Sequence, residues 1–164
     1  PIMVTKIEDK YGNLLANFYP ESHEVITENT AFLMANLLQG VVDEGTGRRL
    51  RFRYGFKNQI GGKTGTTQNH SDGWFIGITP ALSAGVWVGA EDRSIHFQNL
   101  ANGQGASMAL PIWALFMQKV YADKSLAVSQ RDFEKPNGVN KVLDCGDEDR
   151  EGITDDDFSD EIFD

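Results

Sequence analysis

The residues most able to do chemistry lie together in one short glycine-rich run, residues 61–67. Lys63, Thr64 and Thr66 offer one ammonium and two hydroxyls from a single strand edge, and these groups bind a carboxylate through charge-assisted hydrogen bonds. Gly65 leaves room for a substrate backbone beside the strand. The backbone N–H of Thr66 can act as one of two oxyanion donors, each typically contributing about 3 kcal/mol to a transition state. Residues of these types suit a site for a peptide with a free carboxylate, although a lysine-threonine-glycine tripeptide taken alone is common by chance.

Two other interpretations of the same run start from its lysine. An edge strand with an exposed lysine guards a sheet against aggregation and needs no ligand. The order Gly61, Gly62, Lys63, Thr64 also resembles the end of a phosphate-binding loop. That motif requires an earlier glycine where this sequence has Phe56 or Lys57, and it requires a helix starting at the lysine, which the following residues do not predict.

Other residues that could bind ligands have simpler interpretations. His70 lies near Asp72, but no second histidine or cysteine stands at ligand spacing, so we expect no metal site and no cofactor. Four arginines follow Gly47, namely Arg48, Arg49, Arg51 and Arg53. They could attract an anionic polymer, but we favour a solvated loop. The large aromatic residues with aliphatic neighbours are expected to be core: Trp74, Phe75, Trp87 and Trp113.

The first third of the chain predicts a hairpin followed by a helix. Residues 3–9 and 14–19 alternate as strands around turn-forming residues. Apolar residues then recur at helical spacing over 31–42, behind Thr27 as N-cap. The glycine- and arginine-rich connection 45–58 is expected to be partly extended.

The candidate site falls on the first of three predicted strands. Their connections are too short for parallel crossovers, so we expect an antiparallel sheet over 59–67, 73–79 and 83–90. A glycine-rich loop, 102–105, leads into a second helix over 107–121. The order hairpin, helix, three strands, helix indicates an α+β fold with an antiparallel sheet and flanking helices.

The net charge of −9 comes from the end of the chain, where eleven acidic residues and a single base, Arg150, follow position 143. We therefore expect a domain over 1–140 and an acidic tail over 141–164, disordered from Gly146 onward. The near-neutral remainder does not resemble a nucleic-acid-binding surface. No membrane-spanning run or signal-peptide pattern is present, and the lone Cys145 leaves the redox compartment open. We expect the chain to be a segment of a longer protein.

A lysine-threonine-glycine element recurs in penicillin-binding proteins and class A β-lactamases. Its surroundings here resemble the class A, bifunctional penicillin-binding proteins over most of the first 135 residues. The matching runs, in order, are Val4 to Asn13, Ala31 to Gly47 with its ending Gly45-Thr46-Gly47, Gly62 to Thr67, Asp72 to Gly77, Val86 to Gly89, and Pro111-Ile112-Trp113. The resemblance implies part of the transpeptidase fold shared with serine β-lactamases.

The resemblance also implies an activity for the intact protein. In such enzymes an upstream serine attacks a stem peptide ending in D-Ala-D-Ala, and β-lactams acylate the same serine. Lys63 and Thr66 would be catalytic, and substrate would contact residues 64–67: Thr64, Gly65, Thr66 and Thr67. The implied bacterial protein is anchored by an absent N-terminal segment at the extracytoplasmic face of the cytoplasmic membrane.

Two of the family's three catalytic elements are missing. No serine here has a lysine three positions later or an asparagine two positions later. Acyl transfer of this type needs that serine and lysine, so we expect the isolated chain to be inactive. Two alternatives remain open: part of a D,D-carboxypeptidase or β-lactamase, and a non-enzymatic cell-wall-binding module. Upstream sequence encoding the two missing elements, a glycosyltransferase region and a membrane span would distinguish them.

Overall fold

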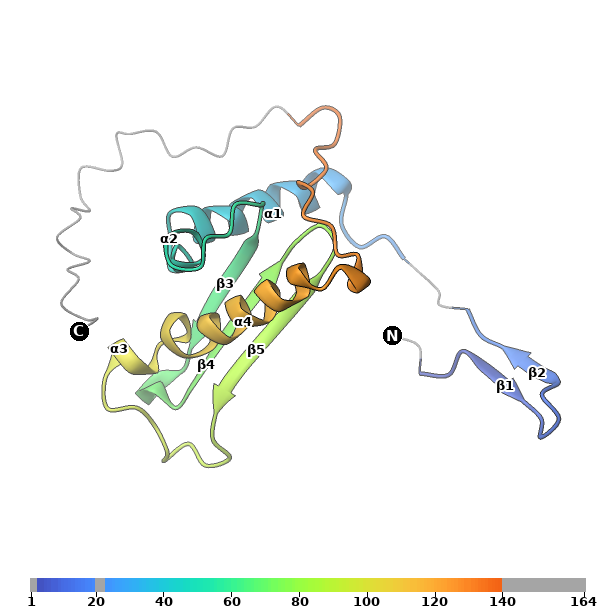
Figure 1. The fold of residues 1–164 in the computed structure, drawn as a ribbon, viewed down its shortest axis with the longest axis horizontal. Coiled ribbons are helices and arrows are strands. Elements are labelled where there is room, and N and C mark those ends of the chain that lie inside the picture. The colour runs from blue at the N-terminus through green and yellow to red at the C-terminus, as the bar shows by residue number, and fades with distance from the viewer. Residues whose placement is uncertain (1–2, 20–22, 140–164) are drawn as a thin grey trace.

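A hairpin, a long helix, a three-stranded sheet and a second long helix follow one another in the computed structural model, which describes residues 3–19 and 23–139 (Figure 1). Two 3-10 turns also occur, η1 (Gln68–His70) and η2 (Lys124–Leu126). The predicted α+β order is confirmed, whereas the acidic tail lies outside the described residues. The strands and α-helices are β1 (Lys6–Glu8), β2 (Leu14–Asn17), α1 (Glu28–Asp43), α2 (Arg49–Phe52), β3 (Gly61–Thr66), β4 (Asp72–Ile78), β5 (Ser83–Gly89), α3 (Leu100–Gly103) and α4 (Gly105–Ala122).

The hairpin of β1 and β2 is closed by a turn that one carboxylate organises. Asp9 accepts hydrogen bonds from the backbone N–H groups of Tyr11 at 2.8 Å and Asn13 at 2.9 Å. Gly12 has φ of 86°, a conformation that favours glycine. Figure 1 shows this hairpin well apart from the three-stranded sheet.

The three-stranded sheet is an antiparallel meander in the order β3-β4-β5, as predicted. Side chains along β4 alternate between its two faces, so Gly73, Phe75 and Gly77 are buried while Trp74 and Ile76 are exposed. The buried face is covered by α4, which crosses the strands in Figure 1. This alternation gives the sheet one closed face and one open face.

Helix α4 lies close to the sheet because glycines make room for its side chains. A Cβ at Gly77 would overlap the ring of Trp113, and a Cβ at Gly73 would overlap the end of Met108. Trp113 is fully buried, packs edge-on against Phe75 with 5.3 Å between ring centroids, and donates from Nε1 to the carbonyl of Ala84 at 3.0 Å. This indole anchors α4 to both β4 and β5.

Helix α1 begins where the sequence predicts and packs against β3. Thr27 caps it by accepting a hydrogen bond from the Thr30 N–H at 3.3 Å. A Cβ at Gly61 would lie 3.1 Å from that of Leu38, so the glycine at the start of β3 lets the helix approach. Buried Val42 joins the same apolar cluster as Trp113.

Two connections expected to lack helix contain one helical turn each. Residues 49–52 form α2, which buries Leu50 and leaves Phe52 exposed, and no strand among the described residues pairs with this segment. The predicted glycine-rich loop at 102–105 is partly helical, because Asn99 caps α3 by accepting from the Asn102 N–H at 3.0 Å. Both corrections come from hydrogen bonds too local to give a periodic pattern.

The core prediction is right for Phe75 and Trp113 and wrong for two other aromatic residues. Trp74 and Trp87 stand opposite each other on the open face of the sheet and are 45% and 47% exposed. Their alternation with buried or half-buried neighbours gives strand periodicity, but periodicity alone does not say whether both faces are covered. Within the described residues, no helix is long and apolar enough to cross a membrane.

Candidate functional site

The lysine-threonine-glycine run forms most of β3, whose one edge pairs with β4. The register places Lys63 opposite Ile76, Thr64 opposite Phe75, and Gly65 opposite Trp74. In the described part of the chain no strand pairs with the other edge of β3. An extended peptide could therefore add itself along this edge through backbone hydrogen bonds.

Lys63 projects from the open face of the sheet. It is exposed and shares that face with Ile76, because directly opposed residues of an antiparallel pair lie on one side. Its side chain bends back so that Nζ donates to the carbonyl oxygen of Thr64 at 2.7 Å. The ammonium therefore lies close to the β3 backbone.

The hydroxyls of Thr64 and Thr66 project from the opposite face, two residues apart on one strand. The oxygen atoms of the Thr64 and Thr46 hydroxyls are 2.9 Å apart, and Thr66 Oγ1 accepts from the backbone N–H of Gly105 at 3.0 Å. Lys63 on one side and the two hydroxyls on the other thus flank the same strand. One ammonium and two hydroxyls thus lie along a single strand, and groups of these types bind carboxylates through charge-assisted hydrogen bonds.

Thr46 and Gly105 are contact residues that sequence reasoning missed. Thr46 stands in a Gly-Thr-Gly run whose spacing to β3 carries no periodic signal, and Gly105 lies about 40 positions beyond Thr66. A Cβ at Gly105 would overlap the carbonyl oxygens of Gly65 and Trp74, so only glycine allows this approach. The signal that could have pointed to them is the abundance of glycine on both sides of the strand.

The structure gives the Thr67 hydroxyl a role in the turn after β3. It lies 3.1 Å from the Ser71 hydroxyl and exchanges hydrogen bonds of 3.1 Å with the N–H and carbonyl of Asp72. The turn also holds Asn69 and His70 with φ of 59° and 53°, so it is a tight left-handed bend. The predicted substrate contact of Thr67 would therefore compete with these bonds.

Arg49 and Arg51, which were expected to be solvated, are instead tied to the fold. Arg49 donates to the carbonyl of Ala106 at 3.0 Å and to the Ser107 hydroxyl at 3.2 Å, so it joins α2 to the first turn of α4. Burial lowers the pKa of the Arg49 guanidinium, and the like charge of Arg53 lowers it further. It remains a cation in the neutral pH range.

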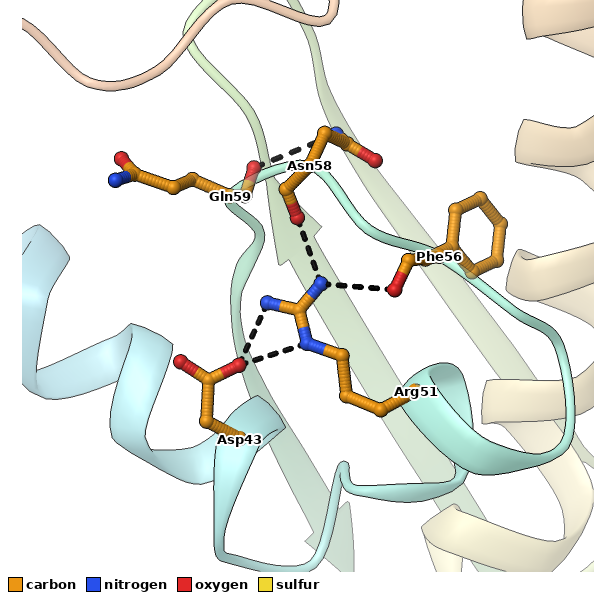
Figure 2. Close-up of polar contacts among 5 residues, drawn as sticks. All are labelled: Asp43, Arg51, Phe56, Asn58 and Gln59. Carbon is orange, nitrogen blue, oxygen red and sulfur yellow. Dashed lines mark hydrogen bonds and ion pairs between the residues drawn. The ribbon is translucent and has the colours of Figure 1, made fainter.

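Arg51 holds the segment that leads into β3, as Figure 2 shows. Its Nε donates to Asp43 Oδ1 at 2.7 Å, and one terminal nitrogen lies 2.6 Å from the same oxygen. The other terminal nitrogen donates to the carbonyls of Phe56 at 3.2 Å and Asn58 at 2.7 Å. One planar guanidinium thus connects the end of α1 to the irregular residues before the site.

The described ranges 3–19 and 23–139 contain no group of three or more His, Cys, Asp or Glu side chains that could hold a metal ion. The polar groups that converge at β3 are one ammonium, two hydroxyls and backbone groups. Groups of these types are suited to binding and polarising an anionic acyl ligand, and none of the named side chains is an activated nucleophile.

The chain belongs to the penicillin binding protein transpeptidase domain family, whose pattern matches residues 1–107. This match spans both the hairpin and the strand that carries Lys63.

Individual relatives carry the same family name. The chain is 34% identical over 136 residues to penicillin-binding protein 1A of Aquifex aeolicus, covering 83% of this chain and 17% of the relative. It is 34% identical over 145 residues to penicillin-binding protein 1A of Clostridium acetobutylicum, covering 88% of this chain and 16% of the relative. The chain thus spans less than a fifth of the length of these relatives.

A solved structure shares the arrangement of the elements. The crystal structure of penicillin-binding protein 1A from Haemophilus influenzae superposes with a TM-score of 0.63 at 25% sequence identity, over 84% of this chain and 25% of that one. The expected partial transpeptidase fold is confirmed.

Proposed function

We propose that this chain forms one wall of the active site of a serine D,D-transpeptidase that cross-links the stem peptides of peptidoglycan. The observation that carries the proposal is the placement of Lys63 and of the Thr64 and Thr66 hydroxyls around the edge of β3 that pairs with no described strand, in a chain of the transpeptidase family. The donor peptide would lie along this edge with its terminal carboxylate near the two hydroxyls. The ammonium of Lys63 would strengthen that binding and organise the upstream serine and lysine.

The reaction is an acyl transfer in two steps. The serine oxygen, supplied by the part of the protein upstream of this chain, forms an ester bond with the penultimate D-alanine carbonyl. The amide bond to the terminal D-alanine breaks, and the departing amine takes the proton that the serine releases. An amine of a neighbouring stem peptide then attacks the ester, restores an amide and returns the proton to the serine. The N–H of Thr66 would donate to the oxyanion in both steps.

The open face of the sheet supports an origin of the nucleophile outside this chain. Trp74, Ile76 and Trp87 lie there, each nearly half exposed, beside Lys63. Clustered aromatic and aliphatic groups on one face of a sheet favour cover by another apolar surface. We propose that the segment carrying the serine packs on this face and so reaches Lys63. The isolated chain is then inactive because no serine in it has the required lysine.

The test compares the whole protein with the isolated chain. Fluorescent penicillin should form a covalent adduct with the full-length protein, and Lys63→Ala should slow that acylation by at least about 100-fold, the scale for loss of one key electrostatic contact. Lys57→Ala, which changes another exposed lysine outside the site, should acylate as the wild type does. A full-length protein that never labels would contradict the proposed function. A stable adduct on the purified 164-residue chain would contradict the external nucleophile.

We also propose that β-lactams bind this edge as mimics of the donor peptide, because they too present an acyl group next to a carboxylate. The whole protein would work at the extracytoplasmic face of the bacterial cytoplasmic membrane, held by an upstream anchor and joined to a glycosyltransferase region. Protease added to intact spheroplasts should degrade it from outside, and complete protection would place it on the other side.

A further inference from the structure

The two hydroxyls proposed to bind the substrate carboxylate are both held by groups from outside β3. Thr66 Oγ1 accepts from the Gly105 N–H at the start of α4, and Thr64 Oγ1 lies 2.9 Å from Thr46 Oγ1 in the connection between α1 and α2. The two partners therefore reach the same face of β3 from different elements.

A threonine hydroxyl has one proton to donate and two lone pairs to accept with. Thr66 accepts from a backbone N–H, so its own proton stays available for an anion at the strand edge. In the pair of Thr46 and Thr64 either hydroxyl could be the donor. A carboxylate only accepts, so when Thr64 gives its proton to that anion, Thr46 must donate to Thr64. Hydrogen bonds in such a chain strengthen one another.

We propose that Thr46 is a positioning residue for this site: its hydroxyl donates to Thr64 and so directs the Thr64 proton toward the substrate carboxylate. The inference rests on the proposed function. Thr46 does not touch the reacting atoms, and its contribution falls on binding of the carboxylate rather than on the chemical steps.

The backbone around Thr46 is held firmly enough for such a role. The N–H of Gly47 donates to the carbonyl of Val41 at 2.8 Å, and the N–H of Gly45 donates to that of Gly40 at 3.1 Å. A Cβ at Gly45 would lie 2.9 Å from the Val41 carbonyl oxygen, so the turn closes tightly on the end of α1. These hydrogen bonds hold the backbone on both sides of Thr46 and so fix the direction in which its side chain projects.

The element that holds Thr66 is joined to the element that holds Thr64. Arg49, three residues after Thr46, donates to the carbonyl of Ala106 and the hydroxyl of Ser107 in the first turn of α4. Gly105 opens the same turn. The two partners of the threonine pair are therefore linked to each other as well as to β3.

The experiment measures acylation of the full-length protein by benzylpenicillin and by its neutral methyl ester, separating the dissociation constant from the acylation rate constant. Thr46→Ala should weaken binding of the carboxylate form about three- to tenfold, the range for one lost hydrogen bond, while the acylation rate constant changes less than about twofold. The same substitution should weaken binding of the methyl ester by less than about twofold. Thr46→Ser, which keeps the hydroxyl, should restore binding.

Thr30→Ala is the matched control, because its hydroxyl forms a similar exposed pair with Thr27, 3.0 Å away at the other end of α1. It should bind both ligands as the wild type does. In a Thr64→Ala background, Thr46→Ala should not weaken binding of the carboxylate form any further, because the Thr64 hydroxyl that Thr46 directs is gone. Equal losses for acid and ester, or additive losses in the double variant, would show a merely structural role and overturn the inference. If the wild type is acylated and Thr46→Ala binds the carboxylate form equally well, only this inference fails. A wild type that is never acylated overturns the proposed function first.

Discussion

Replacing Arg51 by alanine should loosen the segment before β3, because this guanidinium donates to two backbone carbonyls of the irregular residues 53–60 (Figure 2). The change removes two hydrogen bonds to backbone carbonyls and one ion pair with Asp43. Hydrogen bonds from a charged donor contribute about 1.5–3 kcal/mol each, whereas an ion pair with a solvent-exposed partner contributes about 0–1 kcal/mol. The Asp43 side chain is 48% exposed and that of Arg51 24%, so the carbonyl bonds dominate.

Partial rehydration of the freed carbonyls reduces the sum, and we expect a local cost of about 2–4 kcal/mol. At 1.4 kcal/mol for each factor of ten, this cost corresponds to about 30- to 1,000-fold faster hydrogen exchange. The reporter is the N–H of Phe56, which donates to the carbonyl of Leu50 at 3.0 Å. Hydrogen–deuterium exchange of the full-length protein, followed by mass spectrometry, reads this segment directly.

Arg53→Ala is the matched control, since this neighbouring arginine is exposed, and it should change exchange by less than about threefold. Asp43→Asn should change it by less than about tenfold, because the carbonyl bonds remain. The reasoning is refuted if Arg51→Ala exchanges no faster than Arg53→Ala. An effect of Asp43→Asn equal to that of Arg51→Ala would mean that the ion pair dominates instead.

Further predictions concern the sheet, helix α1 and the hairpin. Gly77→Ala should destabilise the sheet by about 1–3 kcal/mol or more, because the added Cβ overlaps Trp113. Gly40→Ala, which has open space around its Cβ, should instead stabilise α1 by up to about 1 kcal/mol. Urea-dependent hydrogen exchange of each region measures both changes. Thr27→Ala should destabilise α1 by about 1 kcal/mol, because the N-cap hydrogen bond is lost. The N–H that Thr27 caps should then exchange roughly fivefold faster, and unchanged exchange would contradict this prediction. Hydrogen bonds within the hairpin turn lower the pKa of Asp9. The Asp9 carboxylate therefore stabilises the hairpin above its ordinary pKa, and this stabilisation is lost as the pH falls through the lower pKa of the folded state. The NMR shifts of the turn amides should titrate with a midpoint below 3.8, and a midpoint at or above 3.8 would contradict this.

The sequence predicted much of the fold because its local signals agree with the tertiary arrangement. Thr27 and the apolar spacing after it define the start of α1, and the short connections between strands dictate an antiparallel meander. Lys63, Thr64 and Thr66 were recognisable because one strand brings them together with no help from distant residues. Helices α2 and α3 were missed, because a single turn has too few residues for a periodic pattern.

Sequence patterns indicated the resemblance to the family, the order of the hairpin, the two long helices and the three strands, and the strand on which Lys63, Thr64 and Thr66 lie, since each rests on neighbours along the chain. Which face of the sheet is covered became clear only from the three-dimensional structure. It left Trp74 and Trp87 open while it buried Trp113, although all three are aromatic residues in regular elements. It also brought Thr46 and Gly105 to the two threonines from elements distant in sequence. Such contacts depend on how elements pack, and packing depends on three-dimensional complementarity that no spacing along the chain encodes.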